Sequence, residues 1–354
     1  MNAYVRDVIE GRARGPAAAL VRGLLAAASA GYGTLHGLHR WSYLMGLART
    51  AMLPAPVISV GNISAGGTGK TPLVEWVVRR LERRRLRVAV LARGYGRRPD
   101  GGDDEDLMGR SDLVRRYADP DRAGAGRRAV AEFHPDAFVL DDGFQHYRLH
   151  RDLDLVTVDA TNPFGYGRLL PRGLLRDRPG ALRRAHAIVL TRTDQVTPAE
   201  LEALRAEVAA HSLDRPVIDT VHRPVAIRTL SDRRSWNVDW VRGRRVYAFC
   251  GVGNPGAFRR TLESAGADVV KFRAFPDHHV YRPAEARHLE VEAQEFMAGA
   301  LVTTEKDATK LDASAFRLPV ASLRVELEAV RGGERLEAIL ESAVRSPDPA
   351  IATL

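Results

Sequence analysis

One stretch beginning at Val57, VISVGNISAGGTGKTPLVEW, constrains the fold of this chain more than any other. Its β-branched start predicts a buried strand, the glycines that follow allow a tight turn, and the Lys-Thr pair begins an apolar-periodic helix. A strand, a glycine-rich turn and a helix N-terminus together form an anion cradle of backbone N–H groups. The stretch therefore predicts a phosphate-binding loop whose nucleotide-binding residues are Gly66, Gly67, Thr68, Gly69, Lys70 and Thr71.

The loop departs from the strict pattern G-x-x-x-x-G-K-[ST], because Ser64 stands where the first glycine is expected. Two hypotheses follow: a nucleotide site of variant sequence, or a strand-to-helix turn whose glycines serve packing alone. The complete context of strand, glycines and helix favours the site. In such a cradle Lys70 contacts the β- and γ-phosphates, and the Thr71 hydroxyl is a ligand of Mg²⁺.

Short apolar runs alternate with helical or polar segments after the loop, which indicates parallel strands joined by crossovers. The acids Asp141 and Asp142 directly follow the run 137–140 in FVLDDGFQH. A phosphate-loop protein places the carboxylate that holds Mg²⁺ or its water at this point, so either acid is a candidate. The other three runs are 87–92, 153–158 and 187–190.

The predicted fold class is α/β: a P-loop NTPase-like, mostly parallel sheet flanked by helices, with a second, smaller α/β domain and an N-terminal amphipathic helical segment. A second α/β pattern begins near Arg244, after a polar, arginine-rich passage. The expected divisions are a membrane-associating segment at 1–54, a kinase-type domain at 55–230, a connector at 231–245, and a smaller domain at 246–354 that closes over the active site.

Charge and cysteine content limit the partners and the compartment. The formal net charge is +9, and nearly all of the positive charge is arginine, which predicts an anionic partner. No aromatic-interleaved basic stretch or zinc-type spacing indicates a nucleic acid. The single cysteine, Cys250, excludes an internal disulfide and fits a reducing compartment. The four lysines, candidates for sites that need a compact charge, are Lys70, Lys271, Lys306 and Lys310.

The segment 16–33, PAAALVRGLLAAASAGYG, imitates a secretory signal because it follows arginines and ends in small residues. Arg22 interrupts its apolar run, which falls short of the roughly 18 to 20 residues of a spanning helix. Leucines and aromatic residues with neighbouring arginines continue to Leu47. Such a segment is expected to lie in an anionic membrane interface. A helical hairpin packed on the domain is the alternative.

Seven motifs in order carry a resemblance to a known family: VGNISAGGTGKTP, ARGYGRR, DDGFQHYRLHRDLDLVTVDA, GYGRLLPRGLLRDRP, VGNP, FPDHH and TTEKDATKL. Together they resemble the tetraacyldisaccharide 4'-kinases, the lipid A kinases of Gram-negative bacteria. The resemblance covers about 57–311. It implies ATP- and Mg²⁺-dependent phosphorylation of the 4'-hydroxyl of a lipid-linked disaccharide 1-phosphate. It also implies a peripheral or monotopic protein on the cytoplasmic face of the inner membrane, without an obligatory protein partner.

The resemblance also implies roles for particular residues. Lys70 and Thr71 match the phosphate and Mg²⁺ residues of the family, and Asp141 and Asp142 match its DDGFQH acids. Asp177 stands where the family usually has glutamate, and it keeps a carboxylate as a metal ligand with a shorter reach.

Two further residues match the acid and the histidine that act at the acceptor hydroxyl. Asp104, in DDED, stands in for the acid of the usual Gly-Asp-Glu-Pro. The histidine comes from FPDHH, where His278 is favoured and His279 is the alternative. A carboxylate beside an imidazole raises its basicity, so the pair would accept the hydroxyl proton once the two domains close.

Two rival functions belong to other classes. Thr191-Arg192-Thr193-Asp194 ends an apolar run much as a guanine-reading loop does, which predicts a GTPase or metallochaperone-like switch. The loop and the amphipathic segment alone would also fit a membrane-bound partitioning-type ATPase. Neither rival accounts for DDGFQH, LLPRGLLRDRP and FPDHH together. Lys306 and Asp307 in TTEKDATKL are predicted either to contact the nucleotide or the domain interface, or to form a salt-bridge pair at a helix start.

Overall fold

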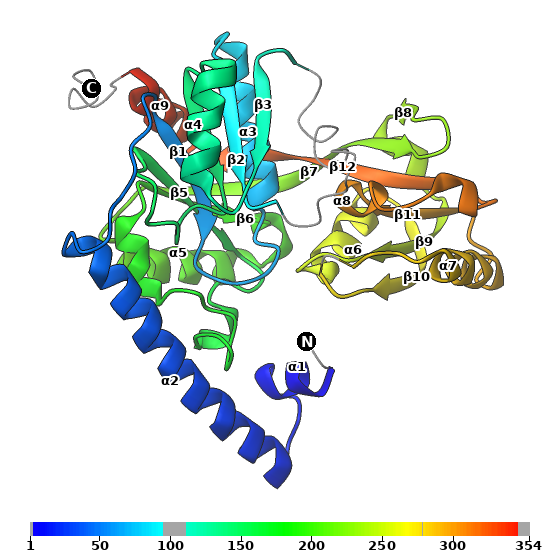
Figure 1. The fold of residues 1–354 in the computed structure, drawn as a ribbon. Coiled ribbons are helices and arrows are strands. Elements are labelled where there is room, and N and C mark those ends of the chain that lie inside the picture. The colour runs from blue at the N-terminus through cyan, green and yellow to red at the C-terminus, as the bar shows by residue number, and fades with distance from the viewer. Residues whose placement is uncertain (1–2, 95–110, 278, 346–354) are drawn as a thin grey trace. The chain divides into compact units, whose positions relative to one another are not determined.

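The computed structural model describes residues 3–94, 111–277 and 279–345, which form two compact units (Figure 1). The first unit contains 1–220 and 329–354, and the second contains 221–328. Asp104 and His278, the predicted acid and histidine of the acceptor site, lie outside the described residues.

The first unit is built on parallel strands in the order β3-β2-β4-β1-β5-β6, followed by the start of β7. All six residues of β1 are buried at the centre of this sheet, as its apolar run predicts. The parallel α/β fold of the sequence prediction is therefore confirmed. The strands are β1 (Val57–Asn62), β2 (Val88–Ala92), β3 (Val114–Ala118), β4 (Ala137–Asp141), β5 (Leu153–Asp159), β6 (Ala187–Thr191) and β7 (Val217–Thr229).

Two helices pack against this sheet through two clusters of described apolar residues. The α4 residues Ala129 and Phe133 join Leu91 and Phe138 of the sheet in one cluster, and Leu204 of α5 belongs to the other. Burial of these apolar faces is the main stabilising contribution to the unit. The helices of the first unit are α1 (Ala3–Ile9), α2 (Pro16–Leu44), α3 (Lys70–Arg83), α4 (Arg122–Phe133), α5 (Pro198–Ser212) and α9 (Gly333–Arg345).

The second unit has its own parallel strands, in the order β10-β9-β11-β12. Its clusters are centred on Tyr247, Phe249 and Val302. The elements are β8 (Ser235–Trp236), β9 (Arg245–Cys250), α6 (Pro255–Ser264), β10 (Asp268–Ala274), α7 (Pro283–Glu295), β11 (Ala300–Thr304), α8 (Glu305–Ala308) and β12 (Val320–Arg331).

The limits of the two units differ from the predicted domain boundaries. The chain leaves the first unit within β7 and returns to it within β12, so 329–345 belongs to the first unit rather than the second. The predicted connector 231–245 lies inside the second unit and contains β8. Long strands shared by two units carry no composition shift, which is why the sequence pattern did not reveal this division.

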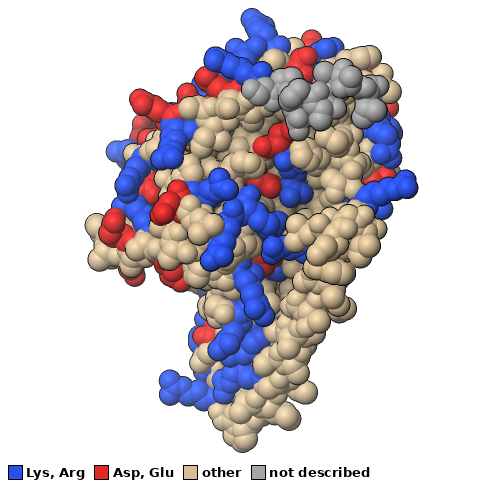
Figure 2. Space-filling view, turned by 90° about the vertical axis from the view of Figure 1, so that its left-hand side faces the viewer, with Lys and Arg blue, Asp and Glu red and all other residues tan. Residues whose placement is uncertain are grey.

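Helix α2 is long, exposed and apolar. By length and composition it is able to cross a membrane, a property that signal sequences near an N-terminus share. Only 6% of the most apolar stretch of 18 residues in this helix is buried. One face of the helix, called here the shielded stripe, is buried at position 18 and partly buried at positions 22, 25, 29, 32, 36, 40 and 43. The leucines on its other faces are exposed. The lower part of the space-filling view shows an uncharged strip beside a run of Lys and Arg (Figure 2). These properties are consistent with membrane association.

Candidate active site

The phosphate loop and the acids meet because their strands are neighbours. β1 and β4 pair in parallel with Val60 opposite Asp141, so both strands end at the same edge of the sheet. The loop follows β1 and Asp142 follows β4. Ligands of parallel α/β sheets bind at the carboxyl ends of the strands, which makes this edge the candidate site.

The backbone explains why serine replaces the first glycine of the loop. Gly66 (φ 113°) and Gly69 (φ 88°) have positive φ, which glycine adopts at little cost. Ser64 instead forms a β-bridge with Leu175, and the neighbouring Ala65 N–H donates to Leu174 O at 2.6 Å. Any residue can adopt the extended backbone of a β-bridge, so position 64 does not require glycine. The variant sequence is therefore compatible with the loop conformation.

Buried hydroxyls hold Thr68, at the centre of the loop. Asn62 Nδ2 donates to Thr68 Oγ1 at 2.8 Å, and Thr157 Oγ1 lies 2.8 Å from the same oxygen. Thr191 Oγ1 donates to Thr68 O at 2.9 Å. These side chains lie at or near the ends of β1, β5 and β6. The sheet therefore holds the loop in place through Thr68, as a preorganised site requires.

Lys70, Asp142 and Arg176 form a charged group beside the loop. Lys70 Nζ lies 3.4 Å from Asp142 Oδ1, and Arg176 Nη1 donates to both oxygens of Asp142 at 2.8 Å. Burial alone raises the pKa of Asp142, but the two cations outweigh it and hold the pKa at about 2. Burial lowers the pKa of Lys70, and Asp142 opposes that shift. Asp142 is therefore ionised at neutral pH and holds the two cations together.

Asp141 has a different environment from Asp142. Burial raises its pKa, and the opposing charges of Arg116 and Lys70 do not cancel that effect. No donor among the described residues makes a hydrogen bond to its carboxylate, although Arg122 Nη2 donates to its main-chain oxygen at 3.1 Å. A half-buried carboxylate that accepts no hydrogen bond from the described residues is stabilised by a cation, so Asp141 fits a Mg²⁺ ligand.

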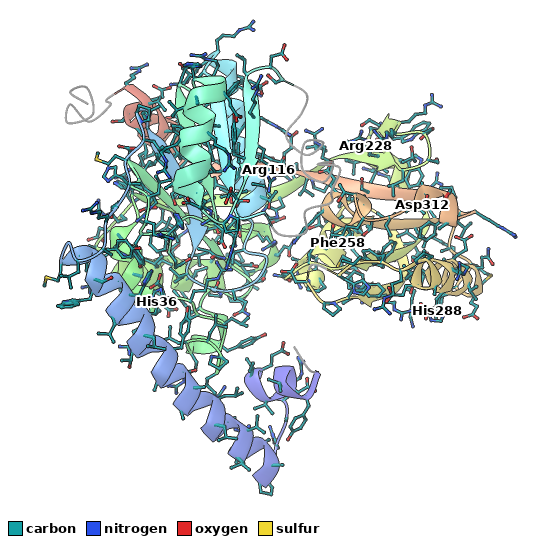
Figure 3. All side chains as sticks on the ribbon, in the orientation of Figure 1. His36, Arg116, Arg228, Phe258, His288 and Asp312 are labelled. Atoms are coloured by element: carbon teal, nitrogen blue, oxygen red, sulfur yellow. The ribbon has the colours of Figure 1, made fainter. Side chains whose placement is uncertain are left out.

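Asp177 lies in a separate cluster of side chains. It is 4% exposed and accepts from Gln145 Nε2 and Arg184 Nη2, both at 3.1 Å. Nδ1 of His36, a residue of α2, lies 3.5 Å from Asp177 Oδ1. His36 is labelled in Figure 3. Gln145 Nε2 also donates to Asn62 O at 2.7 Å, which connects this cluster to the residue that ends β1.

The oxygen donors near the loop suit a hard divalent cation. Thr71 is the second residue of α3 and is exposed, Asp141 ends β4, and Asp142 follows it. Among the described residues, no three His, Cys, Asp or Glu side chains converge as a metal site. A phosphate-loop Mg²⁺ does not need such a cluster, because a hydroxyl, a carboxylate or its water, and phosphate oxygens share its coordination.

The guanine-reading candidate has a structural role here. Arg192, in the lysine place of that loop, has φ 57° and donates from Nη1 to Asp159 Oδ2 at 2.5 Å. Thr193 Oγ1 donates to Thr220 O at 3.2 Å, while Asp194 is exposed. The segment therefore ties the end of β6 to β5 and β7.

The second unit shows how TTEKDATKL and FPDHH are held. Asp307 is fully buried and accepts from Gly251 N at 2.8 Å and from Lys310 Nζ at 3.0 Å. Lys306 Nζ donates to Asp277 Oδ1 at 3.1 Å, so Lys306 and Asp307 each pair with a different residue and the predicted pairing between the two is wrong. His279 stacks on Phe275, with ring centroids 4.5 Å apart, and its Nε2 lies 3.2 Å from a Glu285 oxygen.

Several residues of the site were not predicted from the sequence: Asn62, Gln145, Thr157, Arg176, Thr191 and His36. The threonines carried a usable signal, because each is a hydroxyl within an otherwise apolar strand and such a group needs a partner. Arg176 and His36 act through contacts made by chain segments far apart in sequence, which no local pattern reveals.

Comparison with known proteins gives consistent matches. The family model described as LpxK, tetraacyldisaccharide-1-P 4'-kinase, matches residues 21–345. The tetraacyldisaccharide 4'-kinase of Anaeromyxobacter dehalogenans strain 2CP-C is 42% identical over 349 residues, 92% of each chain. That of Syntrophus aciditrophicus strain SB is 39% identical and covers 79% of this chain and 82% of its own. The crystal structure of "apo" form LpxK from Aquifex aeolicus in complex with ATP has a TM-score of 0.70 and 30% identity, over 92% of this chain and 99% of that one.

Proposed function

Because this chain belongs to the tetraacyldisaccharide-1-P 4'-kinase family, we propose that its phosphate loop binds ATP and that Lys70 and Asp142 serve transfer of the γ-phosphoryl group. The chain is a tetraacyldisaccharide 4'-kinase of lipid A biosynthesis. The observation that carries the proposal is the charged group at the loop, in which Asp142 holds Lys70 at 3.4 Å and Arg176 at 2.8 Å. Phosphoryl transfer needs mainly positioning and charge neutralisation, and these cations supply both.

We propose that Mg²⁺ is held by Thr71 and Asp141, with Asp142 and Asp177 as the further carboxylates. The bound ion would neutralise charge on the phosphates during transfer. The Asp141 carboxylate supports its place in this set because burial raises its pKa and it accepts no hydrogen bond from the described residues. Asp142 and Asp177 already accept from arginine side chains, so in this proposal they orient water or neighbouring groups.

The acceptor is proposed to be the 4'-hydroxyl of a tetraacyl disaccharide carrying a 1-phosphate. Asp104 and His278 are proposed to accept its proton, with the carboxylate orienting the imidazole. The contacts of His279 support this choice between the two histidines. Its ring stacks on Phe275 and packs edge-on against Tyr281, and it pairs with Glu285, which gives it a structural role.

ATP is expected to stabilise the protein against heat more than GTP at equal concentration. Binding to the folded state stabilises by RT ln(1 + [L]/Kd), about 2.7 kcal/mol at 100 times Kd. A thermal-shift titration with Mg²⁺ present measures this difference directly. A larger shift with GTP would support the switch-type alternative and contradict an ATP-dependent kinase.

We propose that α2 lies on the cytoplasmic face of the inner membrane as a peripheral or monotopic anchor. Its leucines are exposed on the faces that do not pack on the unit: Leu20 (68%), Leu24 (65%), Leu35 (69%), Leu38 (57%) and Leu44 (68%). An apolar helix face of this kind, with arginines nearby, binds anionic lipid surfaces. A lipid-linked substrate lies in the same surface, so the anchor would bring the kinase to its acceptor.

A triple variant that combines Leu24→Asp, Leu35→Asp and Leu38→Asp is expected to lose binding to anionic vesicles. The three exposed side chains contribute apolar area that enters the membrane, and carboxylates reverse that contribution while also repelling anionic lipid. Co-sedimentation with phosphatidylglycerol vesicles measures the effect.

The matched control is Leu213→Asp, since Leu213 is 65% exposed and follows α5 rather than α2. It should leave vesicle binding unchanged. Full co-sedimentation of the triple variant would place the anchor elsewhere. Substitutions test the anchor better than deletion of the whole predicted segment 1–54, because Leu53 is buried in the core of the first unit.

A further inference from the structure

The shielded stripe of α2 packs on Tyr147 and contacts residues 169–177 of the first unit. Ser29 Oγ donates to Leu169 O at 2.8 Å and accepts from Arg172 N at 2.9 Å. One turn further along the helix, Tyr32 donates its hydroxyl proton to Arg176 O at 3.0 Å. His36 follows after four residues, and its Nδ1 lies 3.5 Å from Asp177 Oδ1. The spacing of three and four residues places all three side chains on one helix face.

The same segment is hydrogen-bonded to the start of the phosphate loop. Arg176 N donates to Ile63 O at 2.7 Å, and Ala65 N donates to Leu174 O at 2.6 Å. Ser64 and Leu175 form a β-bridge between these bonds. The backbone of 174–177 therefore fixes the entry of the loop, just before its glycines.

The segment also fixes the charged group through a side chain. The Arg176 guanidinium holds both oxygens of Asp142, which lies 3.4 Å from Lys70. A shift of the Arg176 backbone would move the guanidinium and release Asp142 from its position. Two routes thus lead from α2 to the phosphate site, one through backbone bonds to the loop and one through Arg176.

We infer that Tyr32 and His36 are positioning residues for the kinase reaction, which fix Arg176 and Asp177 and thereby hold the phosphate loop and Asp142 in their catalytic arrangement. The helix that presents leucines to the membrane is then also a structural part of the catalytic site. Its two faces have separate tasks: the exposed leucines bind lipid, and the shielded stripe orders the site. This inference rests on the proposed function, because it assumes that Lys70 and Asp142 act in phosphoryl transfer.

The test compares Tyr32→Phe, His36→Leu and their combination in the full-length protein. Loss of the hydroxyl and of the imidazole is expected to lower kcat of the combined variant by about 10- to 100-fold, as for a displacement of catalytic groups on the order of 1 Å. KM for ATP should stay within about twofold of the parent, since Lys70 and the loop amides that bind ATP are unchanged. Co-sedimentation with phosphatidylglycerol vesicles should also stay within about twofold, since the lipid-facing leucines are unchanged. His36→Asn should retain most activity, because its amide can take the place of Nδ1 beside Asp177.

Tyr43→Phe is the matched control. Tyr43 lies on the same helix and packs through its ring against His39 and Tyr147, so removing its hydroxyl keeps these contacts. Thermal unfolding of each variant establishes that it is folded, and Tyr32→Phe alone provides the mildest change if the combined variant unfolds. Lys70→Ala is assayed in parallel.

If Lys70→Ala is inactive, three outcomes would overturn the inference. The first is a kcat of the combined variant within twofold of the parent, and the second is an equal decrease of kcat in Tyr43→Phe. The third is a decrease of kcat that occurs only together with release from vesicles. The last would mean that α2 serves as an anchor alone. An active Lys70→Ala variant would instead contradict the proposed function itself.

Discussion

Lys70→Ala is expected to lower kcat by about 10³-fold or more while the protein remains folded. The substitution removes the cation that contacts the β- and γ-phosphates, and a preorganised charge of this kind contributes a large part of transition-state stabilisation. Asp142 keeps its two bonds from Arg176, so the buried carboxylate remains paired after the change. Steady-state kinetics with ATP and the lipid acceptor measure the loss, and thermal unfolding checks the fold.

Lys271→Ala is the matched control for this experiment. Lys271 belongs to β10 of the second unit, where its Nζ lies 4.7 Å from the ring centroid of Phe296. Loss of this contact should change kcat by less than about twofold. Near-normal activity of Lys70→Ala would rule out the phosphate-loop account of catalysis.

His278→Ala and Asp104→Ala are each expected to lower kcat by about two to four orders of magnitude. The proposed pair accepts the proton of the acceptor hydroxyl, whereas ATP is held by Lys70, Thr71 and the loop amides. The affinity for ATP should therefore change little. The double variant should be hardly less active than either single variant, because residues that act as a unit lose their joint effect once.

His279→Ala is the control for the other histidine of FPDHH. This substitution is expected to lower the stability of the protein rather than the rate of the chemical step. It removes a stacking contact with Phe275 and an edge contact with Tyr281. Additive losses in the double variant would show that Asp104 and His278 act independently. A fully active Asp104→Ala would mean that a different acid orients the histidine.

The sequence predicted the centre of the first unit well. The runs 87–92, 137–140, 153–158 and 187–190 contain the strands β2, β4, β5 and β6, because each is a buried parallel strand with a mostly apolar sequence. β3 was missed, since it is an edge strand whose sequence, VRRYA, is half polar. Apolar periodicity indicates burial, so a partly exposed edge strand has only a weak apolar pattern in its sequence.

The site was predicted in its local parts and missed in its long-range ones. Lys70 and Asp142 were found because a turn and a strand end each have a sequence signature, and the parallel register then brings them together. Arg176 and His36 were not found, since their roles depend on a loop and a helix that meet in the fold. The missing glycine at Ser64 is explained in the same way, by a bridge to Leu175 that lies far along the chain.

The most direct test of the central claim is transfer of label from γ-³²P-labelled ATP to the lipid. The purified protein is incubated with labelled ATP, Mg²⁺ and tetraacyldisaccharide 1-phosphate, and the lipid product is separated and counted. One labelled phosphate is expected at the 4'-position, formed by the parent protein and absent with Lys70→Ala. Label that stays in ATP and free phosphate, with none in the lipid, would contradict it.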